Sequence, residues 1–523
     1  EDRARELRPE DLCAEFSKAV KLSQEHAVAS QLLHSTLEQL SAAYLPHVPH
    51  LTQAQHCTIP LWACAKVDYW RGDLTNSLLQ RLGQDDCGLL KQATGQTHGM
   101  LWWSLSKAPR QELAAGDGGV LHGSAACILR MPAQQLDSQA CSNTLLACAR
   151  LQHRHAPLLH HLTSCLVQQP DASCQALANS LYALGELAEG CGHKPRDQDL
   201  RKLAAAVLAR LQQQQQQQQQ HKKPARQQPQ VQDGNKASAN THVFTEPALA
   251  NMLLGFAKLG VSSKERKLTG CRGQPAAAGR AKAQLQGLIR TSHAGAAGDE
   301  YTAAAAVQQT CSELHLRLQH PVHAQAFVPQ HLANTLWALE RLRPPDSEAL
   351  VQALADECRR RRFAGFSAHD ISIVISAHAK MGFGEASAHY TGPQPWYAAA
   401  AKAAAASDCM QAGIGDWCAL WDAFARVRHR PAPDLLRLMV QSEEELKALC
   451  SSSHAQQCSN LLWALANLGL YEQRLVDALV GRLGERLMLG KRKQRELLSN
   501  MALVNSLWAL AVMGPQVLSR HSG

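Results

Sequence analysis

The stretch Gln330–Leu342, QHLANTLWALERL, has the pattern of an amphipathic helix, and nearly the same words return at Cys458–Leu468 (CSNLLWALANL) and Leu503–Met513 (LVNSLWALAVM). We take Trp337 as the index residue and slide the template L-A-N-T-L-W-A-L-A-K-L along the chain. The template fits at ten places, whose index residues are Trp62, Trp103, Leu146, Tyr182, Leu254, Trp337, Ser376, Asp422, Trp463 and Trp508.

The ten copies recur with a regular period. Most index residues are 36 to 46 residues apart, and two longer steps of 72 and 83 residues contain insertions. A second apolar pattern at three- and four-residue spacing follows each copy, as at Leu350, Leu354 and Cys358. One helix pair cannot bury its own apolar face, whereas stacked pairs can. The sequence therefore predicts an all-α fold, an α-solenoid of stacked helix-turn-helix repeats of about 38–45 residues.

Composition agrees with closely packed helices in a reducing compartment. Hydrophobic residues make up 45% of the 523 residues and aromatic residues only 5%. The 17 cysteines include no Cys-x-x-Cys pair, so we expect small buried side chains and no disulfide framework. Those that fall inside the repeated helix are Cys57, Cys64, Cys141, Cys148, Cys418 and Cys458. No apolar run is long enough to span a membrane, so we expect no membrane insertion.

The pattern divides the chain into six segments. We expect an N-terminal helical cap at 1–50, repeats at 51–195, the end of a repeat helix with a polyglutamine insertion at 196–243, and one repeat at 244–260. A basic Ala- and Gly-rich insertion follows at 261–325, and repeats return at 326–523. Both insertions have low complexity, so we expect them to form mobile loops outside the stack.

The repeated words resemble the octotricopeptide repeat, a family of helical-repeat proteins abundant in green algae. The matching stretches are FVPQHLANTLWALERL at Phe327–Leu342 and near copies beginning at Phe244 and His454. The family's second helix starts with a Pro-Pro-Pro-Glu-Trp-like motif, and Pro393–Trp396 is similar to it. The resemblance covers most of Leu51–Gly514 apart from the insertions.

The resemblance implies a function in the expression of organelle genes. Family members bind single-stranded RNA and stabilise, process, splice or promote translation of organellar transcripts, so the implied partners are organellar mRNA or rRNA and other RNA-maturation proteins. The implied location is the chloroplast stroma, with the mitochondrial matrix as the alternative. Some relatives end in a RAP domain, and no such segment precedes Gly523.

The position four residues after the index, which we call the cation position, is mostly basic. It is occupied by Lys66, Lys107, Arg150, Lys258, Arg341, Lys380 and Arg426, and in the other copies by Glu186, Asn467 and Val512. Stacked repeats would align these cations into a stripe able to follow a phosphate backbone. The alternative is that Lys and Arg simply favour the solvated last turn of a helix, where they complement its dipole.

Two further positions of the template recur. Asn stands three residues before the index at Asn143, Asn179, Asn251, Asn334, Asn460 and Asn505, and we interpret it as a structural residue or as a shared backbone contact. The index residue itself is interpreted as core, with base stacking as the alternative. The slot after the Asn varies, so Thr144, Ser180, Thr335 and Ser506 are candidates for base readout.

No enzyme active site is visible in the sequence. Phosphate-loop, zinc-protease and serine-hydrolase motifs are missing, so we expect no catalytic residues and no cofactor. The histidine group at His153, His155, His160 and His161 lacks further ligands at metal spacing, so we expect no metal either. The alternatives to an RNA-binding factor are an rRNA-clamping subunit of an organellar ribosome and a protein–protein scaffold.

Overall fold

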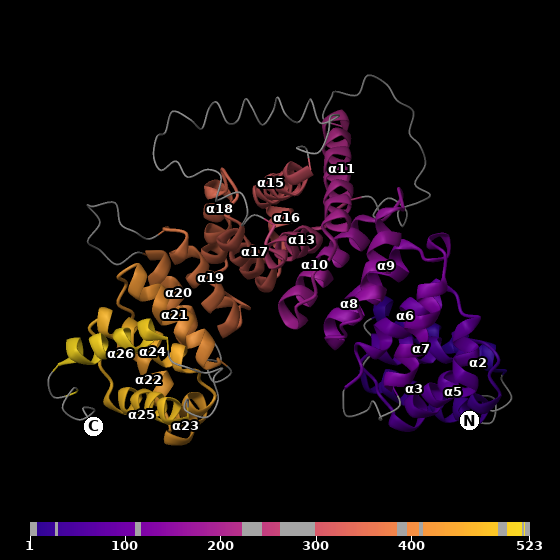
Figure 1. The fold of residues 1–523 in the computed structure, drawn as a ribbon, viewed down its shortest axis with the longest axis horizontal. Helices are drawn as coiled ribbons and strands as arrows, with labels where there is room; N and C mark the ends of the chain where they lie inside the picture. The colour runs from indigo at the N-terminus through magenta and orange to yellow at the C-terminus, as the bar shows by residue number, and fades with distance from the viewer. Residues whose placement is uncertain are drawn as a thin grey trace. The chain divides into compact units, whose positions relative to one another are not determined.

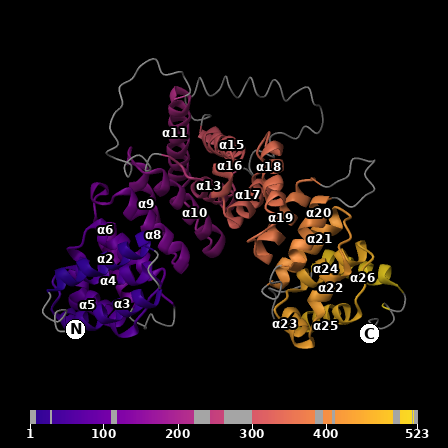
Figure 2. The same ribbon diagram turned by 180° about the vertical axis from the view of Figure 1, so that it is seen from behind.

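The computed structural model describes residues 8–26, 30–109, 117–221, 243–261, 299–383, 395–406, 412–489, 499–514 and residue 517 (Figure 1; Figure 2 from behind). Across those ranges the secondary structure is helical, with turns between helices and no strand. The predicted all-α class is confirmed. The chain divides into two compact units, Glu1–Thr310 and Cys311–Gly523.

Unit 1 is built from two rows of helices. The first row stacks helix on helix and consists of α2 (Pro9–His26), α4 (Ala54–Lys66), α6 (Gly95–Leu105), α8 (Ser138–Leu151), α10 (Cys174–Cys191) and α13 (Glu246–Leu259). The second row consists of α3 (Ser30–Tyr44), η1 (Leu45–His50), α5 (Gly72–Lys91), α7 (Asp117–Arg130), α9 (Ala156–Val167) and α11 (Asp197–His221), with the short η2 (Ala133–Gln135) between rows. Each first-row helix packs on its neighbours in that row, and the helices from α2 to α10 also pack on the second-row helix that follows them.

Unit 2 repeats the plan. Its first row is α17 (Pro329–Leu342), α19 (Ala368–Lys380), α21 (Ile414–Arg426), α24 (Ala455–Asn467) and α26 (Asn500–Met513). Its second row is α18 (Glu348–Arg360), α20 (Pro395–Ala406), α22 (Pro433–Arg437), η6 (Leu438–Val440), α23 (Glu443–Ser451) and α25 (Gln473–Leu489). The helix α15 (Asp299–Leu318) crosses the division between units and is followed by α16 (Pro321–Ala326). Both units are thus stacked helical repeats.

Six of the first-row helices begin after a capping residue that stands nine positions before the index. The side chain of that residue accepts a hydrogen bond from the backbone N–H three residues later, which satisfies one free donor of the helix end. This cap is present at Thr94, Asp137, Ser173, Thr245, Ser367 and Ser499. The same cap at the same position explains why copies with different index residues begin their helices in the same register.

The residue one position before the index fills the hydrophobic core between the helices. Trp102, Trp421 and their equivalents are buried, and this set is Leu61, Trp102, Leu145, Leu181, Leu253, Leu336, Ile375, Trp421 and Leu462. The six repeat cysteines are buried as well, and the described part of the chain holds its cysteines as free thiols. The expectation of small buried cysteines is confirmed.

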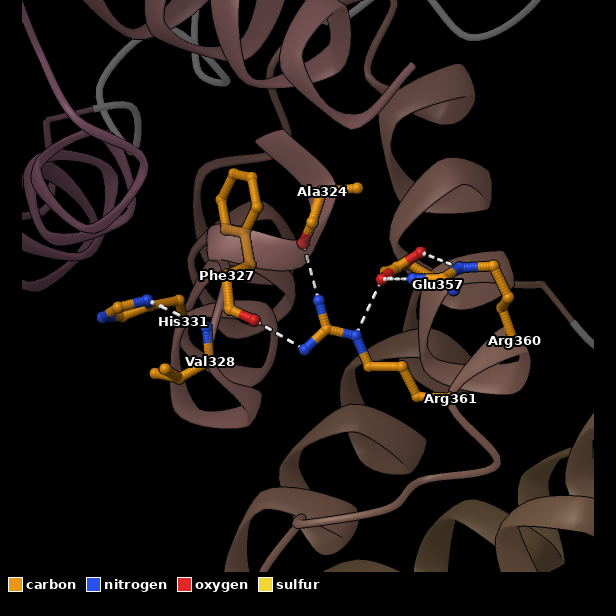
Figure 3. A network of polar contacts seen from close by, with 7 residues as sticks. All are labelled: Ala324, Phe327, Val328, His331, Glu357, Arg360 and Arg361. Carbon is orange, nitrogen blue, oxygen red and sulfur yellow. Dashed lines mark hydrogen bonds and ion pairs between the residues drawn. The ribbon is translucent and has the colours of Figure 1, made fainter. Parts of the chain in front are cut away.

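Arginines in or just after second-row helices connect the two rows in four of the repeats. Arg81, Arg210 and Arg482 donate to the carbonyls of Leu51, Pro170 and Ser451, which precede the first-row helix of the same repeat. Arg361, just after α18, does the same, donating to the carbonyls of Ala324 and Phe327 at 2.6 Å each and to Glu357 at 2.7 Å (Figure 3). Sequence reasoning missed these bonds, which make these four arginines structural.

The described part of the motif at Pro393–Trp396 helps to hold the fold together. Pro393 and Gln394 lie outside the described residues, whereas Pro395 and Trp396 open α20. The Trp396 indole N–H donates to the Ala355 carbonyl at 2.9 Å, and its ring stacks on His378 at 4.3 Å between centroids. The tryptophan therefore anchors α20 on α18 and α19.

The polyglutamine segment is not the loop that low complexity predicted. Gln212–Gln220 continues α11, which ends at His221, because glutamine is a good helix former and nothing in the run stops the helix. Gln214 is buried, and its side-chain oxygen accepts the Phe244 N–H at 3.0 Å. The following residues, 222–242, lie outside the described part.

The second predicted insertion is also partly helical. The end of the expected loop 261–325 forms α15 and nearly all of α16, and Ala306, Val307 and Leu314 of α15 are buried. The segment 262–298 lies outside the described residues. The expected boundary at 325 is therefore too late, because an alanine-rich composition that resembles low complexity also favours a helix.

The outer face of α26 differs from that of its neighbours. On α24, Ser459 and Leu462 are buried, and Ser459 Oγ donates to the Ala502 carbonyl of α26 at 2.7 Å. The equivalent residues on α26, Val504 and Leu507, are 59% and 54% exposed. The positions that a following helix covers in the other copies are thus open on α26.

Candidate nucleic-acid interface

In the seven copies where it is basic, the cation position lies in or just past the last turn of the first-row helix. Six of the seven predicted cations are exposed, namely Lys66, Lys107, Arg150, Arg341, Lys380 and Arg426, and Lys258 is half-buried. Exposure alone does not make them equivalent, because their neighbours differ from repeat to repeat.

Three of these cations form one group in unit 1. Lys66 ends α4, Lys107 lies two residues past the end of α6, and Arg150 lies in the last turn of α8; these three helices stack in succession. The charge of Arg150, followed by partial burial and by Lys66, lowers the pKa of Lys107, and Asp68 opposes this shift. Both neighbouring cations therefore lie close enough to act on the Lys107 ammonium. A cluster of like charges without a carboxylate bonded to each is a surface suited to an anion.

Two tryptophans flank this group. The Lys66 ammonium lies 5.0 Å from the ring centre of Trp103 and 6.0 Å from that of Trp62, so it contacts indoles on two neighbouring helices. Both tryptophans are half-buried. We call the face formed by α4, α6 and α8 around Lys66, Lys107 and Arg150 the basic face.

Two of the predicted phosphate contacts are held by carboxylates. Lys258 Nζ lies 2.6 Å from Glu186 and 2.9 Å from Glu189, and its side chain is 13% exposed. Burial lowers the pKa of Lys258, but the two carboxylates outweigh burial and leave that pKa raised. Arg426 bonds Asp422 of its own helix at 2.7 Å. Sequence reasoning treated Lys258 and Arg426 as available for phosphate. The two carboxylates enclose Lys258, whereas the side chain of Arg426 remains 48% exposed beside its partner.

Unit 2 carries its own, less concentrated charge. The Arg341 guanidinium lies 4.5 Å over the ring of Trp337, the index residue of the same helix. Lys380 is exposed on the next first-row helix, and its backbone carbonyl accepts a bond from Arg343. Arg341 and Lys380 therefore occupy the positions that the stripe requires. In the next copy along the chain, Arg426 is paired with Asp422.

The index position is not core in the copies where it is aromatic. Trp62, Trp103, Tyr182, Trp337 and Trp463 are half-buried, and Trp508 is 43% exposed. Only copies with a smaller residue, such as Leu146 and Leu254, bury it. The interpretation of the index as core is wrong for the aromatic copies, because the residue before it fills the core instead.

Sequence reasoning also missed a row of amides on the same face. Exposed glutamines stand seven residues before the index in six copies, at Gln55, Gln96, Gln139, Gln175, Gln330 and Gln456. The recurrent asparagines are half-buried beside them, and two pairs are bonded, Gln175 to Asn179 at 2.7 Å and Gln456 to Asn460 at 2.8 Å. Within the described ranges the recurrent asparagines show no bond to a neighbouring repeat. In copies such as those of Trp103 and Trp337, this face carries amide, aromatic and cationic groups in that order along the chain.

The four predicted base-readout residues point away from this face. Thr144, Ser180, Thr335 and Ser506 are all buried. The hydroxyls of Thr144, Thr335 and Ser506 donate to carbonyls one turn earlier in their own helices, at 2.7 to 2.9 Å. The base-readout assignment of these residues is therefore wrong, because the slot after the Asn faces a packed neighbour.

The histidine group is partly embedded between helices. The rings of His153 and His155 stack at 6.2 Å, and His155 caps α9 by accepting the Leu158 N–H. Among the residues that the structure describes, no group of three or more His, Cys, Asp or Glu side chains is arranged to hold a metal ion. His153 and His155 lie between α8 and α9 and not within a helix, and both are half-buried.

Comparison with known proteins gives little further guidance. No family model matches the chain, and no curated protein matches it. A homology model of the full-length AP-3 complex in an intermediate open conformation is similar over 99% of this chain and 84% of that chain, with 11% identity and a TM-score of 0.25. A likeness this weak carries no argument about function. Over the described ranges, no helix combines the length and apolar character needed to cross a membrane.

Proposed function

We propose that this chain binds single-stranded RNA along its first-row helices. The observation that carries the proposal is the basic face, where Lys66, Lys107 and Arg150 lie on three successive helices beside Trp62 and Trp103. Cations at repeat spacing suit the phosphates of an extended strand, and exposed indole surface suits unpaired bases. A duplex hides its bases from such aromatic platforms, so single strands should be preferred.

We further propose that the chain acts by occupancy and not by catalysis. Covering an RNA segment would protect it from nucleases or keep it unpaired. The resemblance of its repeats to octotricopeptide repeats supports a place in organellar gene expression, in the chloroplast stroma or, as the alternative, the mitochondrial matrix. The amide row supports contacts shared by all repeats more than a base code, because the same Gln and Asn recur in most copies.

The function can be tested by sequencing the RNA that the tagged full-length chain retains from cells after nuclease trimming. We expect short footprints in one or a few organellar transcripts, which would also identify the organelle. Stoichiometric rRNA fragments would instead support the ribosomal subunit. Failure to enrich RNA over a mock purification would contradict the proposal and favour the protein scaffold.

A further inference from the structure

The charge at the cation position of unit 1 changes from positive to negative at α10. Passing from α4 to α6 and α8, the cation position holds Lys66, Lys107 and Arg150, and on α10 it holds Glu186. Glu189 follows Glu186 by three residues and so lies on the same side of α10. The carboxylate side chains of Glu186 and Glu189 are 26% and 46% exposed, so this acidic pair borders the basic face.

The acidic pair also forms ion pairs with the next cation of the row, Lys258. Lys258 of α13 binds both carboxylates, at 2.6 and 2.9 Å. The two helices approach unusually closely, because a Cβ on Gly185 would lie 3.0 Å from the Gly255 backbone and a Cβ on Gly255 would lie 2.5 Å from the Leu181 carbonyl. Glycines at this crossing bring the Lys258 side chain under the acidic pair, and Figure 1 shows α10 and α13 side by side.

Charge at this point opposes a phosphate backbone. A strand that passed from Arg150 toward α13 would meet Glu186 and Glu189 before reaching an ammonium already bonded to both of them. Repulsion between the carboxylates and a phosphate is stronger at a half-buried site than in open water, because less solvent screens it. Lys258 is therefore unavailable as the next phosphate contact, because the carboxylates repel the phosphate and because its ammonium is already bonded to them.

From this arrangement we infer that Glu186 and Glu189 form the boundary of the RNA track on unit 1, which is a short segment confined to α4, α6 and α8. The inference rests on the proposed function. At about one nucleotide per helical repeat, such a segment takes about three nucleotides and three phosphates. A track of fixed length defines where a bound strand must leave the surface, which a uniform stripe would not do.

The test removes the boundary and asks whether Lys258 joins the track. The ligand is a 20-nucleotide oligouridine, and binding of the full chain is followed by fluorescence anisotropy from 50 to 300 mM KCl. We expect Glu186→Gln with Glu189→Gln to raise affinity about tenfold and to steepen the salt slope by about 0.7, the value for one added phosphate contact on a single strand. Adding Lys258→Gln should return the slope to that of the wild type.

A matched control changes charge by the same amount elsewhere. Glu348→Gln with Glu485→Gln removes two exposed carboxylates from the second-row helices α18 and α25, and should leave the slope unchanged. The single variant Glu189→Gln keeps the bond between Glu186 and Lys258, so it should raise affinity by a smaller factor without steepening the slope. A thermal melt of each variant checks that α10 and α13 stay folded.

The outcomes separate the boundary from the function. If the double variant folds and neither affinity nor slope changes, while the wild type binds oligouridine, the boundary is wrong and RNA binding stands. An equal gain in the control pair would mean that net charge alone is responsible, which also overturns the boundary. If the wild type does not bind oligouridine at any salt concentration, the proposed function and the boundary both fail.

Discussion

Replacing Lys66, Lys107 and Arg150 together by glutamine should weaken binding of single-stranded RNA by about 100-fold at 0.1 M salt. Each residue is expected to neutralise one phosphate, so the slope of log K against log salt should fall in magnitude by about 2. All three side chains are exposed at helix ends, so the fold should be unaffected. Anisotropy titrations of wild type and variant at several salt concentrations measure both quantities.

The control for this variant removes three other cations of unit 1. Arg130, Lys194 and Lys202 are exposed and lie on or beside second-row helices. Their joint replacement by glutamine changes net charge equally but should leave the slope nearly unchanged. A similar loss in both triple variants would show that RNA responds to overall charge and not to the basic face.

Mild acid should destabilise the chain through its buried histidines. Burial lowers the pKa of His98 in unit 1 and of His378 in unit 2 to about 4. His98 Nδ1 bonds Ser124 Oγ at 2.7 Å, and His378 Nδ1 bonds Tyr397 Oη at 2.9 Å. Since the unfolded chain binds these protons near pH 6.5, stability is full above that pH and is lost as pH falls toward 4. At pH 5 the loss should be about 2 kcal/mol for each histidine.

Urea unfolding at pH 7.5 and pH 5.0 tests this dependence. In His98→Gln the difference between the two pH values should shrink by about 2 kcal/mol, because glutamine does not titrate. The exposed His50 is the matched control in the same unit, and His50→Gln should keep the full difference. Equal pH dependence in wild type and His98→Gln would show that His98 is not protonated on unfolding in this range.

The repeat was predictable because its signals are local. Caps such as Ser173 and Ser367, buried cysteines and the ten index positions all lie within one helix of the template. The orientation of the helix was predictable in principle as well. At about 100° per residue, the positions seven and three before the index, the index and the cation position share an arc of about 60°, whereas the slot after the Asn lies on the far side. Treating Trp337 as core concealed this, since large apolar residues are usually buried.

Contacts distant in sequence were beyond local reasoning. Glu186 and Lys258 are in different helices, separated by the polyglutamine segment. No residue near Lys258 in the sequence therefore indicates that its ammonium forms an ion pair with Glu186. The bonds from Arg361 to Ala324 and Phe327 have the same character (Figure 3). The sequence identified where cations recur, and the packing of neighbouring repeats decided which of them remain open to a ligand.

The most direct test of RNA binding by the first-row helices is to compare the affinity of the purified wild-type chain for one labelled RNA as a single strand and as a duplex, across a salt series. We predict that the single strand binds more tightly at every salt concentration and that the affinity falls as salt rises, with a slope reporting at least three phosphates. Equal affinity for both forms would contradict stacking on Trp62 and Trp103, and binding of neither form would contradict the account as a whole.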